Sequence, residues 1–181
     1  MKSPPPPETL ALLRDGRAIR VRPIRPDDAQ RLSEFHDKLS QNTIRLRFFT
    51  PLRHLSPKFA RHLADVDFKA RCAFVISFPG DDTIHGVGRY EGESIRSAEV
   101  AFVVEDDMQG LGIGPILLER LVEHARANAF ERLTAVVLSE NTMMLLLFRD
   151  SPYLPEIHIH RDTAFVKLDI REVADRPATE L

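Results

Sequence analysis

The sequence predicts an α+β domain, in which a mostly antiparallel sheet is flanked by helices. Three strand-like segments follow one another between residues 71 and 104, and such a meander forms antiparallel pairs. Segments with the apolar spacing of helices precede and follow this meander. After residue 104 the order is helix, strand, helix, and a strand-helix-strand unit requires one parallel pair. The 181 residues are enough for one domain with a sizeable core.

The first half of the domain begins with a strand and continues with helices. Residues 17–25 alternate apolar side chains with arginines, which is the period of a half-buried strand. Pro26, Asp27 and Asp28 are typical of a helix start. We therefore expect a helix from about residue 29, a short one over residues 43–49, and a third that begins at Ser56-Pro57.

The second half contains the meander and the elements after it. The expected strands of the meander are Arg71 to Phe78, Ile84 to Tyr90 and Ala98 to Val104. Helical spacing follows Gly114, and residues 133–138 form an apolar run rich in β-branched residues. We expect a helix over residues 141–148 and a closing hairpin of residues 156–160 and 164–170.

The two ends of the chain are expected to lie outside the domain. Pro4 to Pro7 favour an extended polyproline conformation without internal hydrogen bonds, so residues 1–13 are predicted to be a mobile tail. The domain is predicted to cover residues 14–171, and residues 172–181 to form a C-terminal tail.

Composition and charge exclude several classes of function. A formal charge of -2 and a pI near 6.4 give no general attraction to nucleic acid or to an anionic membrane. No apolar run reaches the roughly 18 to 20 residues that cross a bilayer, and the N-terminus lacks the apolar core of a signal peptide, so we expect a cytoplasmic protein. The single cysteine, Cys72, excludes an internal disulfide and a cysteine-based zinc site, and we expect no metal. A homodimer is left open.

A glycine-rich loop is the main candidate for a binding site. Gly110, Gly112 and Gly114 fall between the strand that ends at Val104 and a helix that Pro115 can open as its first residue. Free N–H groups at such a helix start favour an anion, and glycines allow a phosphate to approach closely. The loop does not fit a P-loop, because Pro115 and Ile116 follow Gly114 where a lysine and a serine or threonine are required. It does not fit a dinucleotide fingerprint either, because one residue and not two precedes its third glycine. A glycine-rich turn without a ligand is the alternative.

The run from Gln109 to Gly114 resembles the coenzyme A signature of the GNAT N-acetyltransferases, Gln/Arg-x-x-Gly-x-Gly/Ala. The resemblance extends over roughly residues 14–170 and implies a sheet with a central, splayed parallel strand pair. It also implies that the loop binds the cofactor's pyrophosphate, that the strand before it binds the pantetheine arm, and that an asparagine after the next strand helps to hold that arm. The residues concerned are Gln109, Gly110, Leu111, Gly112, Ile113 and Gly114, then Val103 and Val104, and then Asn141.

A narrower resemblance is to the bacterial protein lysine acetyltransferases. It rests on Asp15-Gly16, on residues 19–28 and on residues 45–49. The resemblance implies acetyl-coenzyme A as co-substrate and direct transfer of the acetyl group to a primary amine, with a protein lysine as the first candidate. Two alternatives stay open: a small amine or amino acid as acceptor, and a non-catalytic domain that binds acyl-coenzyme A as a sensor.

The expected chemistry needs a base near the acceptor amine, because a lysine with a pKa of about 10.4 is almost wholly protonated at neutral pH. Glu99 lies on the strand that leads into the glycine loop, and by resemblance this position supplies the general base. Many family members have a tyrosine as general acid seven residues after the asparagine. Phe148 occupies that position here, and Tyr153 is the substitute if the following loop folds back.

Overall fold

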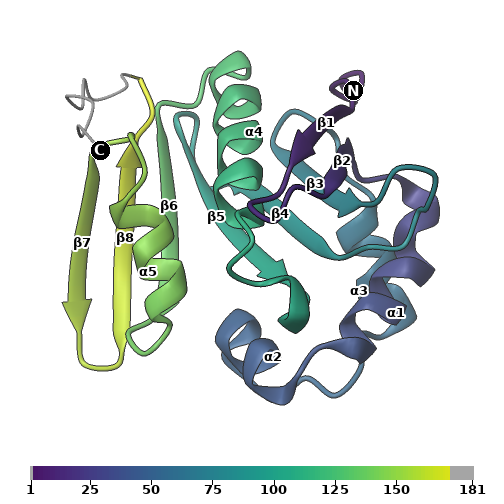
Figure 1. The fold of residues 1–181 in the computed structure, drawn as a ribbon. Helices are drawn as coiled ribbons and strands as arrows, with labels where there is room; N and C mark the ends of the chain where they lie inside the picture. Colours follow the sequence, from purple (N-terminus) through teal and green to yellow (C-terminus); the bar gives the residue numbers. More distant parts are fainter. Residues whose placement is uncertain (1, 172–181) are drawn as a thin grey trace.

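The computed structural model describes residues 2–171, which form one eight-stranded sheet with helices on both faces (Figure 1). The sheet order is β1-β2-β3-β4-β5-β6-β8-β7. The strands are β1 Thr9–Leu12, β2 Ala18–Pro23, β3 Arg71–Ser77, β4 Gly86–Gly92, β5 Ser97–Val104, β6 Arg132–Leu138, β7 Pro155–His160 and β8 Thr163–Asp169. The α-helices are α1 Ala29–Lys38, α2 Gln41–Phe48, α3 Pro57–Ala64, α4 Ile113–Ala127 and α5 Thr142–Arg149, and two 3-10 turns cover Pro26–Asp28 and Asp106–Met108.

The sheet is antiparallel except for the pair of β5 with β6. Their register joins Ser97 to Arg132, Ala98 to Leu133 and Glu99 to Thr134, and the pairing ends there. Beyond Glu99 the two strands diverge (Figure 1). The predicted mixed sheet with a central, splayed parallel pair is therefore confirmed.

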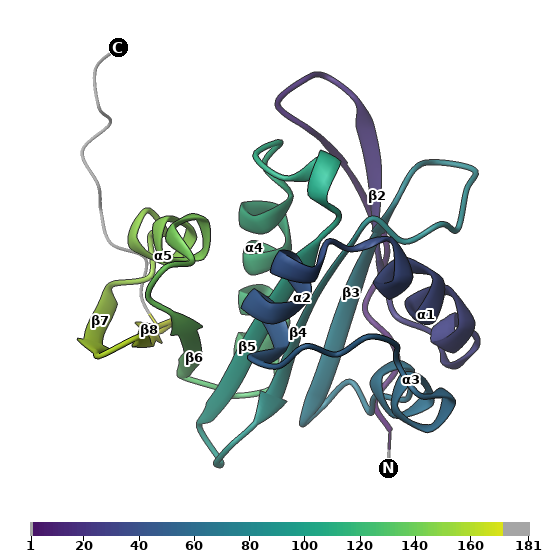
Figure 2. The ribbon, with the colours of Figure 1, turned by 90° about the horizontal axis from the view of Figure 1, so that it is seen from below.

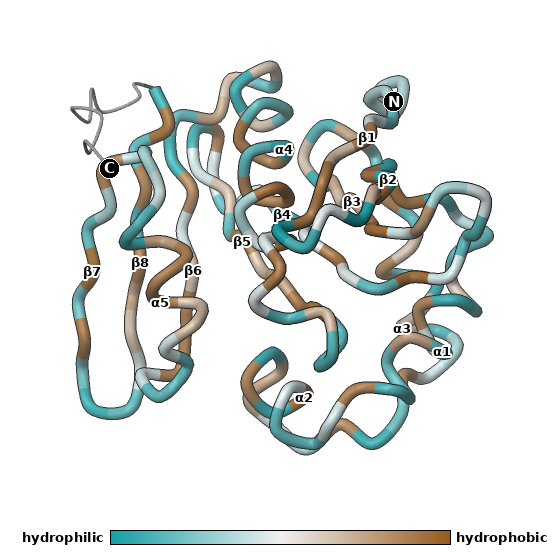
Figure 3. Tube along the Cα trace, viewed as in Figure 1, coloured by the Kyte–Doolittle hydropathy of each residue, from teal (hydrophilic) through white to brown (hydrophobic). Residues whose placement is uncertain are grey.

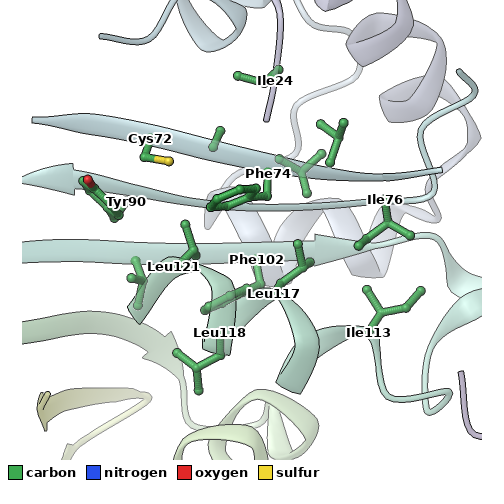
Figure 4. Close-up of a cluster of buried hydrophobic side chains, with 14 of the residues drawn as sticks. Ile24, Cys72, Phe74, Ile76, Tyr90, Phe102, Ile113, Leu117, Leu118 and Leu121 are labelled. Atoms are coloured by element: carbon green, nitrogen blue, oxygen red, sulfur yellow. The ribbon is translucent and has the colours of Figure 1, made fainter. Parts of the chain in front are cut away.

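The helices cover the two faces of the sheet unequally. Helix α4 packs on β3, β4 and β5, whereas α1 and α3 pack together on the other side of these strands (Figure 2). The core between α4 and the strands contains Phe74, Tyr90, Phe102 and Leu117 (Figure 4). Gly88 is needed there, because a Cβ atom at this position would lie 3.0 Å from the Cβ of Leu117.

A strand lies within the segment that was predicted to be a tail. Residues 9–12 form β1, an edge strand that pairs with β2 from Thr9 opposite Val21 to Leu12 opposite Ala18. Leu10 and Leu12 are both 71% exposed, so this strand buries little apolar surface and carries a weak sequence signal. The domain limits at residues 14 and 171 stay a prediction, and residues 172–181 lie outside the described residues.

A buried ion pair joins β2 to the start of α1. The guanidinium of Arg22 donates two hydrogen bonds to the carboxylate of Asp28, at 2.7 and 2.8 Å, and both side chains are 0% exposed. The backbone N–H of Arg25 donates to the same carboxylate at 2.8 Å. Burial alone would raise the pKa of Asp28, but the hydrogen bonds from Arg22 and Arg25 outweigh it and lower that pKa.

The longest helix of residues 2–171, α4, has 15 residues, and none of the helices in this range is long and apolar enough to cross a membrane.

Candidate active site

The glycine loop presents backbone N–H groups that have no partner. Within residues 2–171, none of the backbone N–H groups of residues 110–114 donates a hydrogen bond. The loop's carbonyls are bonded instead: Leu111 accepts from the backbone N–H of Arg14 at 3.0 Å, and Gly112 from Ile116 at 3.4 Å. Gly110 and Gly112 have φ angles of 77° and 95°, a region that side chains disfavour. The result is a concave row of donors of the kind that binds phosphate.

Helix α4 begins two residues earlier than the sequence suggested. Gly112 is its N-cap, Ile113 is its first residue, and Pro115 lies in the first turn. Proline is tolerated there because the N–H groups of the first helical turn have no carbonyl partner within the helix. Gly114 in the same turn faces Leu147 of α5, whose side chain would lie 3.4 Å from a Cβ atom at this position.

A cleft of about 630 Å³ opens beside this loop, between β5, α2, the start of α4 and α5. Its volume is typical of a cofactor site. Its walls include the loop, the end of β5 and an apolar side formed by α5, which is rich in hydrophobic residues (Figure 3). Met143 and Leu146 of α5 are 58% and 36% exposed. Such exposed apolar side chains beside a cleft are typical of a surface that a ligand covers.

Most of the residues expected to bind the cofactor lie together in the wall of this cleft. They are Val103, Val104, Gln109, Gly110, Gly112, Ile113, Gly114 and Asn141. Leu111 does not line the cleft and packs against the core instead. The side chain of Gln109 donates to the carbonyl of Val104 at 3.1 Å and thus stabilises the turn between strand and loop. The side-chain oxygen of Asn141 caps α5 by accepting from the N–H of Met144 at 3.2 Å.

Helix α2 is fixed over the divergent strands by Asp106, which follows β5. The carboxylate of Asp106 accepts hydrogen bonds from the backbone N–H of Ser40 at 2.9 Å, from the Ser40 hydroxyl at 2.6 Å and from the Thr43 hydroxyl at 2.8 Å. Helix α2 contacts both β5 and β6. The bonds to Asp106 therefore place Thr43, Leu46 and Arg47 in the cleft wall.

Glu99 lies on β5 at the last residue that pairs with β6, where the two strands begin to diverge. Its side chain is exposed and is not part of the cleft wall. Partial burial and the charges of Glu93 and Glu91 raise the pKa of Glu99 above its ordinary value, and the charge of Arg47 partly opposes this. The raised pKa makes Glu99 a stronger base than an ordinary glutamate.

Residues 40–150 match the profile of the acetyltransferase (GNAT) family, which is more than half of the chain. The chain belongs to the GNAT acetyltransferase family. It is therefore an acyltransferase with the GNAT fold.

Three relatives of this GNAT protein are similar over most of its length. An acetyltransferase of Pseudomonas aeruginosa is 33% identical over 73% of either chain. The crystal structure of the GNAT domain of the S. lividans protein PAT is 32% identical with a TM-score of 0.82, and the match covers 90% of this chain and 96% of that one. The acetyltransferase Pat of Mycolicibacterium smegmatis is 31% identical over 73% of this chain, which is 40% of the relative's length.

Phe148 and Tyr153 of this GNAT domain differ in where their side chains lie. Phe148 is 1% exposed and packs against Phe102, with 6.1 Å between ring centroids. The loop after α5 brings Tyr153 into the cleft wall, where the side chain is 7% exposed and burial raises its pKa. The raised pKa makes the Tyr153 hydroxyl a weaker acid than an ordinary tyrosine.

Arg14 is a charged cleft residue that sequence reasoning missed. It lies between β1 and β2, lines the cleft, and its guanidinium donates to the carbonyl of Gly110 at 3.4 Å. This places a positive charge against the glycine loop. No local pattern in the sequence relates the two segments, which are 96 residues apart.

Proposed function

We propose that the protein transfers an acetyl group from acetyl-coenzyme A to the side chain of a protein lysine. The observation that carries this proposal is the row of free N–H groups at residues 110–114, which lies at the mouth of a cofactor-sized cleft. In the proposed complex these groups bind the pyrophosphate of coenzyme A, and Arg14 adds a positive charge beside them.

The edge of β5 suits the pantetheine arm. Within residues 2–171, the pairing of β5 with β6 stops at Glu99, so the edge of residues 100–104 that faces β6 has no ladder partner. The amides of pantetheine can bond to this edge as another strand would, beside Val103 and Val104. The apolar side chains of α5 then cover the arm, and the thioester lies toward Glu99.

Direct transfer follows from this placement. Glu99 takes a proton from the acceptor ammonium, through water where the distance requires it. The neutral amine nitrogen attacks the thioester carbonyl carbon, so that an N–C bond forms and the C–S bond breaks. The second nitrogen proton passes to the solvent, and the coenzyme A thiolate leaves. Tyr153 lines the cleft and is the candidate proton donor to this thiolate.

A cationic acceptor fits the charges around Glu99. Glu91, Glu93 and Glu99 lie near one another at the ends of β4 and β5, and all three are exposed. Arg71 and Arg89 pair with Glu91 at 3.6 and 3.2 Å. The attraction for an ammonium group therefore comes from Glu93 and Glu99. The resemblance to bacterial protein lysine acetyltransferases favours lysine in a protein over a small amine.

The acceptor is tested by incubating the purified protein with acetyl-coenzyme A and lysine peptides, polyamines or free amino acids, while thiol release and acceptor mass are followed. Lysine peptides acetylated faster than small amines would support the proposal. Faster acetylation of small amines would assign the site to a small acceptor. Cofactor binding without any product would indicate a sensor domain.

Replacing Gly112 with valine is expected to weaken coenzyme A binding at least tenfold, about 1.4 kcal/mol. The φ of 95° disfavours a β-branched side chain, which also changes the loop that carries the free N–H groups. Calorimetry with coenzyme A measures the effect. Gly80→Val is the matched control, because Gly80 has a similar φ of 82° in a turn outside the cleft. Equal affinity of a folded Gly112→Val protein and the control would refute this placement of the phosphates.

Replacing Arg14 with alanine is expected to weaken coenzyme A binding about tenfold and leave pantetheine binding unchanged, because pantetheine lacks the phosphates. The matched control is Arg17→Ala in the same hairpin, whose guanidinium is paired with Asp15 at 2.7 Å. Titrations at low and high salt measure the charge dependence. If Arg14→Ala weakened pantetheine as much as coenzyme A, Arg14 would be shaping the cleft and not binding phosphate.

A further inference from the structure

Two arginines line the cleft, and they lie toward opposite ends of it. Arg14 lies against the glycine loop, where the phosphates of coenzyme A are proposed to bind. Arg47 lies on α2 one helical turn beyond Thr43, whose hydroxyl accepts a hydrogen bond at 3.3 Å from Gln109 at the start of the loop. Arg47 therefore lies further along the cleft from the loop, where Glu99 and Glu91 act on it. Phosphate binding gives Arg47 no role, because in the proposed complex the loop and Arg14 already bind the phosphates of coenzyme A.

The guanidinium of Arg47 has no anionic partner at hydrogen-bonding distance. Within the described part of the chain, no carboxylate or carbonyl oxygen accepts a hydrogen bond from it, and the ring of Phe48 lies 4.9 Å from its Cζ atom. The side chain is partly buried. Burial lowers the pKa of Arg47, although the charges of Glu99 and Glu91 oppose this. A desolvated guanidinium with unused donors favours a carboxylate, which it can bind through two parallel hydrogen bonds.

The neighbouring arginine of the same helix shows the contrast. Arg45 donates to the carboxylate of Glu140 at 2.6 Å, outside the cleft wall. Arg47, two residues later, turns into the cleft instead. The two guanidinium groups are chemically the same. That of Arg45 already binds a carboxylate of this chain, and that of Arg47 does not.

We infer that Arg47 binds an acyl group that ends in a carboxylate, so that the protein also accepts dicarboxylic acyl donors of the succinyl type. The inference rests on the proposed position of acyl-coenzyme A in the cleft and not on the identity of the acceptor. A carboxylate on the acceptor is the alternative ligand, because Arg71 and Arg89 lie 3.6 and 3.2 Å from Glu91 and offset its charge. This alternative predicts no change in donor preference when Arg47 is replaced.

The transfer step is the same for this donor as for acetyl. The amine nitrogen bonds to the thioester carbonyl carbon, the C–S bond breaks, one nitrogen proton goes to Glu99 and the other to solvent, and coenzyme A leaves as the thiolate. The distal carboxylate takes no part in the bonding changes and stays paired with Arg47. The product is an amide with a free carboxylate, so an acylated lysine changes from positive to negative.

The test compares two donors of equal shape. Isocaproyl-coenzyme A replaces the two carboxylate oxygens of succinyl-coenzyme A with methyl groups. Calorimetry gives the ratio of their affinities for the wild-type protein and for Arg47→Met, Arg47→Lys and Arg45→Met, and thermal unfolding verifies that each variant is folded. We expect Arg47→Met to lower the succinyl preference at least about tenfold. Arg47→Lys should lower it less, and Arg45→Met should leave it unchanged.

An unchanged ratio in folded Arg47→Met and Arg47→Lys would overturn the inference. Arg47 would then serve only to offset the charges of Glu99 and Glu91, and its loss would move the low-pH limb of the rate to higher pH without changing donor preference. Because these titrations contain no acceptor, they do not depend on whether lysine is the substrate. Continued acetyl transfer with an unchanged ratio would leave the proposed function intact.

Discussion

Replacing Glu99 with glutamine is expected to lower the rate of acetyl transfer at neutral pH by about 10²- to 10⁴-fold, the usual loss for a missing general base. Glutamine keeps the shape of the side chain and removes its basicity. Glu99 lies outside the cleft wall, so coenzyme A binding should not change. Glu156→Gln is the control, since Glu156 is another exposed strand glutamate, which lies on β7 and is paired with Lys167 of β8.

The pH dependence gives a second readout for Glu99. The base acts only when it is ionised, so the wild-type rate should fall as the pH falls through the pKa of Glu99, which partial burial and Glu93 raise above its ordinary value. The rate of the Glu99→Gln variant should not show this fall at low pH. At high pH the acceptor deprotonates in solution, so the two profiles should converge toward the acceptor's own pKa. Wild-type turnover of Glu99→Gln at pH 7 would remove Glu99 from the mechanism.

Replacing Asp28 with alanine is expected to destabilise the domain by about 3 to 5 kcal/mol, because buried Arg22 would lose both hydrogen bonds to a carboxylate and keep only the more distant Asp82, 3.6 Å from its Nε atom. Urea unfolding measures the change. Asp27→Ala is the matched control: its exposed carboxylate lies 3.6 Å from Arg31, and such a surface pair contributes about 0 to 1 kcal/mol. A cost of Asp28→Ala equal to that of Asp27→Ala would contradict this role of the pair.

The same pair predicts a dependence of stability on pH. Because the folded pKa of Asp28 is lowered, its contribution is fully present above the pKa of the unfolded chain and is lost as the pH falls through the folded pKa. Asp28→Asn should therefore flatten the acid side of the stability profile. If the stability of Asp28→Asn fell with decreasing pH as steeply as that of the wild type, other carboxylates would be responsible for the acid dependence.

The parts of the site that were predictable are local in sequence. The residues from Gln109 to Gly114 are consecutive. Their glycines indicate a backbone that a ligand approaches closely, and Gly110 and Gly112 have positive φ. The strand before the loop, which carries Glu99, was predicted from the residues directly preceding these glycines. The alternation of strand and helix periods was enough to predict the mixed sheet, because apolar spacing reflects which face of each element is buried.

The parts that could not be predicted depend on tertiary contacts. Arg14 reaches the cleft from a segment 96 residues away from the glycine loop, and nothing near it in the sequence indicates this contact. Asp106 binds Ser40 across 66 residues and thereby positions α2. β1 was missed because an exposed edge strand buries too little apolar surface to leave a pattern.

The structure of the protein bound to acetyl-coenzyme A, determined by crystallography, tests the central claim most directly. The pyrophosphate oxygens should lie within hydrogen-bonding distance of the backbone N–H groups of residues 110–114, and Arg14 should contact a phosphate. The pantetheine arm should follow the free edge of β5, with the thioester directed toward Glu99. A cofactor bound outside this cleft, or one whose phosphates lie away from the glycine loop, would contradict the proposed site.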